Sequence, residues 1–103
     1  MTENQYQAKL IKKLKALFPG CVVMKTDSGY QQGSPDLILL FREFWASLEV
    51  KASASSLEMP NQAYFVNKLD DMSFAAFIYP ENEAEVLGAL QQAFTVSGRT
   101  RVS

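Results

Sequence analysis

The sequence has no histidine and only one cysteine, Cys21, among its 103 residues. Without an imidazole, the chain cannot build a serine–histidine triad or a histidine-rich zinc site. A single cysteine cannot form a disulfide within the chain, and this usage fits a reducing compartment. We interpret Cys21 as a small buried hydrophobic residue.

Long apolar runs and a strong net charge are also lacking. No run approaches the roughly 20 apolar residues that a membrane-spanning helix needs, and the N-terminus lacks a signal-peptide pattern. We therefore expect a cytoplasmic protein without a membrane partner. The formal net charge of −1 does not indicate nucleic-acid binding, although local patches matter more than totals.

What the chain does have is enough apolar sequence for one small core. Hydrophobic residues make up 48% of it, and its length is typical of one domain. We expect a single domain over residues 1–103, with a core from about 2 to 94 and a loosely held tail over 95–103.

A helix is predicted at the start of the chain. Thr2 and Gln5 form a capping-box pattern, apolar residues then recur at helical spacing, and Pro19-Gly20 ends the helix. The other helix faces carry four lysines: Lys9, Lys12, Lys13 and Lys15.

Short apolar runs predict three strands after this helix. They lie at 21–24, 36–41 and 44–52, with a loop over 27–34. Only Arg42-Glu43 joins the last two strands, which are therefore expected to form an antiparallel hairpin. This dipeptide is not a favoured two-residue turn, so the register stays open.

The second half of the chain predicts a helix, a strand and a helix. Pro60 suits a first helical turn, and the strand at 74–79 is apolar throughout, which predicts a central place in the sheet. Acidic residues from Glu81 favour the start of a last helix that runs through Phe94. This order predicts an α/β fold with a mixed four-stranded sheet flanked by helices, in which the crossover helix makes the last strand parallel to a neighbour.

Three charged residues fall on the predicted hairpin. If it turns at Arg42-Glu43, Asp36 lies opposite Glu49 and both point to the same side of the sheet. Strand alternation places Lys51 on that side too. Two carboxylates so close repel each other unless a positive charge lies between them. A divalent cation meets this need, and a few oxygen ligands with retained waters are typical of Mg²⁺.

The spacing can bring these three side chains to one point, as metal-assisted attack of water on a phosphoryl group requires. A metal lowers the pKa of a bound water and polarises a phosphoryl oxygen, while a nearby lysine orients the water or stabilises developing negative charge. The competing interpretation is a solvated strand end with a surface ion pair between Glu49 and Lys51, worth about 0–1 kcal/mol. The strand context of both residues, and the position of Asp36 directly after Ser34-Pro35, favour the site.

Pro35-Asp36 followed by Glu49-Val50-Lys51 resembles the PD-(D/E)XK nuclease superfamily, whose restriction-endonuclease-like core has the order α-β-β-β-α-β. Within it the chain resembles the VRR-NUC group of phage and repair nucleases. The resemblance rests on the segment Gly33-Ser34-Pro35-Asp36-Leu37 and on Gln62 near the start of the second helix, and it spans about Thr2 to Glu85.

The resemblance also implies roles for individual residues. A magnesium ion, for which Mn²⁺ may substitute, is held by Asp36, Glu49, the Val50 carbonyl and Glu3, while Lys51 positions the attacking water and Gln62 supports Lys51 or a phosphate. The residues implied to bind DNA are Gln7, Lys25, Ser28 and Gly29. Lys25 stands where arginine is more usual, and lysine lacks the planar fork of arginine.

Other readings of the same residues stay open. Glu3 also suits a helix N-terminus through the helix dipole. Lys12 is a candidate for contact with a DNA backbone, but lysines on a helix also form ordinary solvated faces. Asp71-Met72 follows the second helix where many members of the group have a small residue and glycine.

The resemblance implies a metal-dependent endonuclease that cuts DNA, structure-specific and of the Holliday-junction-resolving kind. Members that stand alone act as homodimers, and two-fold symmetry would place two active sites on the two strands of a branched substrate. A phage-encoded enzyme of this kind would act in the cytoplasm of the bacterial host. Two alternatives stay open: a non-catalytic DNA-binding or assembly module of the same fold, and a nicking or restriction-type endonuclease on ordinary duplex.

Overall fold

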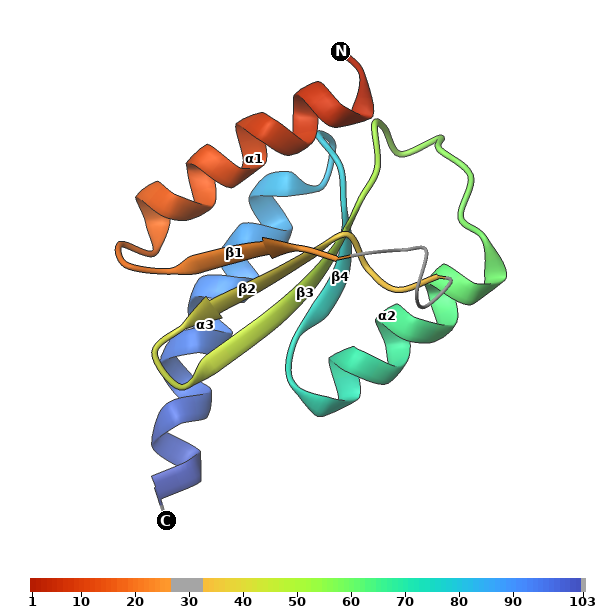
Figure 1. The fold of residues 1–103 in the computed structure, drawn as a ribbon. Coiled ribbons are helices and arrows are strands. Elements are labelled where there is room, and N and C mark those ends of the chain that lie inside the picture. The colour runs from red at the N-terminus through yellow and green to blue at the C-terminus, as the bar shows by residue number, and fades with distance from the viewer. Residues whose placement is uncertain (27–32, 103) are drawn as a thin grey trace.

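The computed structural model describes residues 1–26 and 33–102, and side chains as far as residue 95. Three helices and four strands occur in these residues (Figure 1). In chain order they are α1 (Glu3–Leu17), β1 (Val22–Lys25), β2 (Leu37–Phe41), β3 (Phe44–Val50), α2 (Pro60–Met72), β4 (Ala75–Ile78) and α3 (Glu83–Val102). The predicted order α-β-β-β-α-β-α is confirmed, and so is the α/β fold class with a mixed four-stranded sheet flanked by helices.

The sheet has the strand order β1-β2-β3-β4. β1 pairs with β2 and β2 with β3 in antiparallel fashion, while β3 and β4 are parallel. The hairpin register joins Leu37 with Leu48 and Phe41 with Phe44, so the turn is at Arg42-Glu43 as expected. Arg42 adopts a φ of 57°, the left-handed conformation that a tight hairpin turn requires and that arginine seldom takes.

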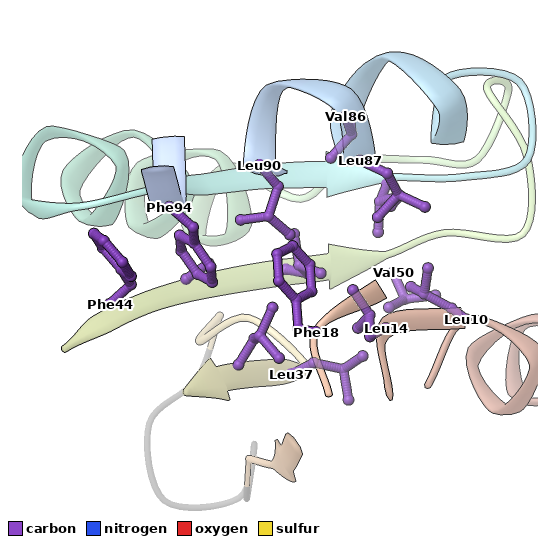
Figure 2. Close-up of a cluster of buried hydrophobic side chains, with 14 of the residues drawn as sticks. Leu10, Leu14, Phe18, Leu37, Phe44, Val50, Val86, Leu87, Leu90 and Phe94 are labelled. Atoms are coloured by element: carbon purple, nitrogen blue, oxygen red, sulfur yellow. The ribbon is translucent and has the colours of Figure 1, made fainter. Parts of the chain in front are cut away.

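Helices cover the two faces of the sheet unequally. α1 and α3 pack on one face, where their apolar side chains meet those of β2 and β3 (Figure 2). α2 packs on the other face, against β3 and β4. The core between the sheet and helices α1 and α3 includes fully buried Leu10, Leu14, Leu48 and Leu90. Burying a leucine of this kind contributes roughly 1.5–3 kcal/mol.

The prediction of a central place for the fourth strand is wrong. β4 lies at the edge of the sheet, with β3 as its single partner among the described strands. Its apolar sequence has another cause, because α2 covers one of its faces and α3 the other. A strand buried on both faces reads as continuously apolar wherever it lies in the sheet. Its parallel pairing with β3 agrees with the prediction.

The ends of several elements also differ from the predicted ones. α3 starts at Glu83 because Asn82 caps the preceding turn: its Oδ1 accepts a hydrogen bond from Tyr79 N at 2.9 Å, and its Nδ2 donates to Phe77 O at 3.0 Å. The helix continues to Val102, where a loosely held tail was expected. Cys21 precedes β1 and is half-buried against the core, where a buried place was predicted.

α3 is the longest helix, with 20 residues. Neither it nor any other helix in the described part of the chain is long and apolar enough to cross a membrane.

Candidate functional site

β3 buries both of its faces, and the side chains on the two faces differ in kind. One face carries Ala46, Leu48 and Val50 into the core. The other face, which we call the polar face of β3, carries Ser47 and Glu49 and continues to Lys51 just after the strand. Glu49 is 3% exposed and Lys51 is 8% exposed. A surface ion pair between them, the competing interpretation of the sequence, does not fit this degree of burial.

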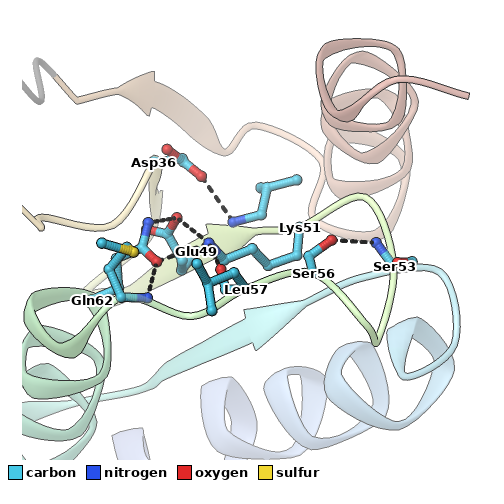
Figure 3. Close-up of polar contacts among 9 residues, drawn as sticks. Asp36, Glu49, Lys51, Ser53, Ser56, Leu57 and Gln62 are labelled. Atoms are coloured by element: carbon cyan, nitrogen blue, oxygen red, sulfur yellow. Dashed lines mark hydrogen bonds and ion pairs between the residues drawn. The ribbon is translucent and has the colours of Figure 1, made fainter.

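Asp36 reaches the polar face of β3 from the residue before β2. The register that joins Leu37 with Leu48 places it opposite Glu49. Its Oδ2 accepts a hydrogen bond from Val50 N at 2.9 Å (Figure 3). Its carbonyl accepts one from Thr26 N at 2.9 Å. The half-buried carboxylate is thus held against β3, while the Asp36 backbone is held at the end of β1.

The Lys51 ammonium group is held by two acceptors. Its Nζ donates to Gln62 Oε1 at 2.8 Å and to Leu57 O at 3.0 Å. It also lies 4.0 Å from Glu49 Oε2. An ammonium group has three donors, so one N–H remains for a further acceptor.

Gln62, in the first turn of α2, bridges the acidic and basic members of the group. Its Nε2 donates to Glu49 Oε2 at 3.1 Å, while its Oε1 accepts from Lys51. The same Oε1 accepts from Met59 N at 3.0 Å, which fixes the amide against the start of the helix. The predicted supporting role of Gln62 therefore has a geometric basis (Figure 3).

The Glu49 carboxyl is in an unfavourable electrostatic position. Its pKa is raised to about 8, mainly by burial and also by the neighbouring Asp36 carboxylate, against the opposing effect of Lys51. Its Oε1 is buried and has no hydrogen-bond partner among the described residues. A buried acceptor without a partner costs roughly 1–3 kcal/mol. A cation between the two carboxylates would relieve both the repulsion and the missing contact.

The further residues predicted to bind a metal fit less completely. Glu3 is exposed in the first turn of α1, and its charge contributes to the raised pKa of Glu49. Among residues 1–26 and 33–102, no three His, Cys, Asp or Glu side chains lie close enough together to hold an ion. The Val50 N–H donates to Asp36 Oδ2, which places the Val50 backbone next to this carboxylate. The described site therefore offers two carboxylates, with Glu3 acting through its charge.

The residues predicted to bind DNA are distributed around this centre. Lys25 is exposed at the end of β1, opposite Leu37, and so lies near Asp36. Lys12 is exposed on α1, whereas Gln7 is only 9% exposed and has little surface to offer to a ligand. Ser28 and Gly29 lie outside the described residues.

Two features of this region lie beyond the sequence predictions. The first is the Leu57 carbonyl, since no sequence pattern marks a backbone acceptor for Lys51. The second is a link between α1 and α3: Tyr6 Oη donates to Glu83 Oε1 at 2.8 Å, and Lys13 forms an ion pair with the same carboxylate. Burial raises the pKa of Tyr6, and its hydrogen bond to Glu83 raises it further. Glu83 is far from Tyr6 and Lys13 in the sequence, so no local sequence pattern predicts these contacts.

The chain matches none of the protein-family models, curated proteins or solved structures with which it was compared.

Proposed function

We propose that this chain is a metal-dependent nuclease that hydrolyses phosphodiester bonds in DNA. The observation that carries the proposal is the Glu49 carboxyl, which is buried beside Asp36 with Oε1 unpartnered among the described residues. A stable core has no use for this arrangement, because an apolar side chain would fill the same place without electrostatic cost. A cation that needs oxygen ligands gives it a function.

Asp36 and Glu49 suit Mg²⁺, with Mn²⁺ as a substitute, since hard divalent cations prefer carboxylate oxygens. The Val50 carbonyl is a further proposed ligand, while Glu3 acts through its charge. When bound, the ion supplies a more acidic water and a Lewis acid for the phosphoryl oxygen. The protein's own part is to keep two carboxylates at a fixed separation, which the hairpin register and the Asp36–Val50 hydrogen bond accomplish.

Lys51 is proposed to position the attacking water and to stabilise the negative charge that develops on the phosphate. Its ammonium group is fixed by Gln62 Oε1 and Leu57 O, and one N–H remains for a reacting group. Preorganised donors of this kind stabilise a transition state without reorganisation. Gln62 also donates to Glu49, so one amide sets the spacing between the Glu49 carboxyl and the Lys51 ammonium group.

The substrate we propose is branched DNA, cut by a homodimer of the Holliday-junction-resolving kind. This part of the proposal is supported by the resemblance of Gly33-Ser34-Pro35-Asp36-Leu37 and Glu49-Val50-Lys51 to the VRR-NUC group. A domain of this size offers little surface to a duplex, and a two-fold dimer would bring two sites to two strands. The low cysteine content supports a cytoplasmic location.

The test is cleavage of labelled four-way junctions, linear duplex and single-stranded DNA with Mg²⁺, Mn²⁺ or EDTA. We expect wild type to cut only with metal and to prefer the junction, and Glu49→Gln to be inactive. Equal cutting of junction and duplex would favour a nicking or restriction-type enzyme. Absence of cutting by folded wild type on every substrate would overturn the enzyme and favour a DNA-binding module.

A further inference from the structure

A cavity of about 450 Å³ lies beside the candidate site. It is lined by Gly33, by Met59 just before α2, and by Pro60, Asn61 and Gln62 in the first turn of α2. This volume falls within the range of roughly 300–1,000 Å³ that is typical of pockets for small organic groups. Gln62 belongs both to the cavity wall and to the group that contains Glu49 and Lys51, so the two sites share one side chain.

The backbone of Gly33 approaches the wall of this cavity more closely than any other residue type could. Gly33 has a φ of +88°, and a Cβ atom there would lie 2.5 Å from Asn61 Cβ and 2.9 Å from its carbonyl carbon. Contacts under 3.0 Å do not occur for real Cβ atoms. Because Gly33 has no side chain, the segment before β2 can pack directly against the start of α2.

The chemistry of the lining suits a flat heterocycle. Met59 and Pro60 offer apolar surface, and the Met59 side chain is half exposed. A thioether makes favourable contacts with aromatic rings. The exposed Asn61 amide carries both donors and an acceptor, which match the edge of a base. The cavity lining contains no acidic or basic side chain among the described residues.

We propose that this cavity binds an unstacked nucleobase of the strand being cut, next to the scissile phosphate. The inference rests on the proposed nuclease function and narrows its substrate. An unpaired base enters such a pocket freely, whereas a paired base must first leave the stack, which costs a few kcal/mol. The preferred substrates would then carry an unpaired nucleotide beside the cut, as in a flap, a bulge or an open branch point.

The first experiment measures binding and needs no cleavage. Wild-type protein in EDTA is titrated into fluorescent flap DNA with either a normal nucleotide or an abasic nucleotide beside the branch. Loss of one base that contacts the Met59 thioether is expected to weaken binding roughly 2- to 10-fold. Met59→Ala should weaken binding of the normal flap and leave the abasic flap unaffected. Asn61→Ala should have the same effect, because it removes the amide that faces the base. It leaves the packing on Gly33 intact, since alanine keeps the Cβ and backbone atoms there.

Met72→Ala is the matched control. Met72 is the last residue of α2, at the opposite end from the cavity, and is 61% exposed against 51% for Met59. The same proteins are then assayed for cutting with Mg²⁺, where the two cavity variants should raise KM for the normal flap more than they lower kcat.

Three outcomes separate the two proposals. If wild type cuts DNA but Met59→Ala and Asn61→Ala bind both flaps as Met72→Ala does, the base pocket is overturned and the nuclease stands. If the abasic flap binds as tightly as the normal one, the pocket is likewise overturned. If folded wild type neither binds nor cuts any DNA, both proposals fail together.

Discussion

The two faces of β3 are almost equally buried but differ in their energetic role. Leu48 and Val50 on the core face are fully buried among apolar neighbours, which stabilises the fold. On the polar face, Ser47 Oγ and Glu49 Oε1 are buried without a hydrogen-bond partner among the described residues. Burial therefore stabilises the fold on the core face and indicates a functional role on the polar face, because buried polar atoms without partners oppose folding.

The largest expected effect is on activity and comes from the polar face. Lys51→Met keeps the length of the side chain but removes the ammonium group that Gln62 and Leu57 hold. We expect the cleavage rate to fall by about 10²–10⁴-fold, the usual range for a group that acts in proton transfer or charge stabilisation. The measurement is single-turnover cutting with Mg²⁺.

Lys15→Met is the matched control, since Lys15 is exposed in the last turn of α1. It should cut at the wild-type rate. Wild-type cutting by the Lys51→Met protein would remove Lys51 from the mechanism and would make the polar face a structural feature.

The next effect is on stability and compares neighbouring residues on opposite faces. Leu48→Ala should lower the free energy of unfolding by about 2–5 kcal/mol, because it leaves a cavity in the core. Ser47→Ala removes a hydroxyl without a partner among the described residues, and should change stability by less than about 1 kcal/mol or increase it. Urea denaturation measures both. Similar losses in the two variants would show that the faces do not differ as described.

Two glycines with the same backbone conformation allow the packing of the connection before β2 to be tested. Gly20 and Gly33 have φ values of +89° and +88°, but a Cβ at Gly20 meets nothing within 4 Å. Gly20→Ala should cost roughly 1–2 kcal/mol from the left-handed conformation alone. Gly33→Ala adds the clash with Asn61 and should cost roughly 2–4 kcal/mol. Equal thermal stability of the two variants would contradict the close packing.

The last effect concerns the pH dependence of stability without metal. The pKa of Glu49 is raised from 4.5 to about 8 in the folded protein. Between these values the folded state binds more protons than the unfolded state, so the stability falls as pH rises through this window. Glu49→Gln lacks this titration. In EDTA, its stability relative to wild type should rise by on the order of 1–3 kcal/mol from about pH 5 to about pH 8.

Urea denaturation of the two proteins across this pH range measures the difference. Other carboxyl groups titrate in both proteins, so only the change in the difference is informative. If the free energies of unfolding of the two proteins change in parallel with pH, the group that titrates in this window is not Glu49.

Local sequence signals predicted the hairpin and the site that it builds. The single dipeptide Arg42-Glu43 between two apolar runs predicted an antiparallel hairpin but left its register open, and the observed register brings Asp36 opposite Glu49. Alternation then placed Lys51 on the same face. The capping box of Thr2 and Gln5 is also present, and α2 begins at Pro60 as predicted.

What the sequence could not supply depends on contacts between distant segments. The edge position of β4 follows from how α2 and α3 cover it. The Leu57 carbonyl reaches Lys51 through the path of a connection without a repeating pattern. Tyr6 and Glu83 meet because α1 and α3 share one face of the sheet. None of these contacts has a period or motif that a local analysis could detect.

The most direct test of a metal centre on the polar face of β3 is titration of the folded protein with Mn²⁺, with binding measured by calorimetry or electron paramagnetic resonance. We expect wild type and Ser47→Ala to bind the ion with similar affinity, and Asp36→Asn and Glu49→Gln each to bind at least about tenfold more weakly. Absence of binding to folded wild type, or equal affinity in all four proteins, would contradict a metal centre on the polar face of β3.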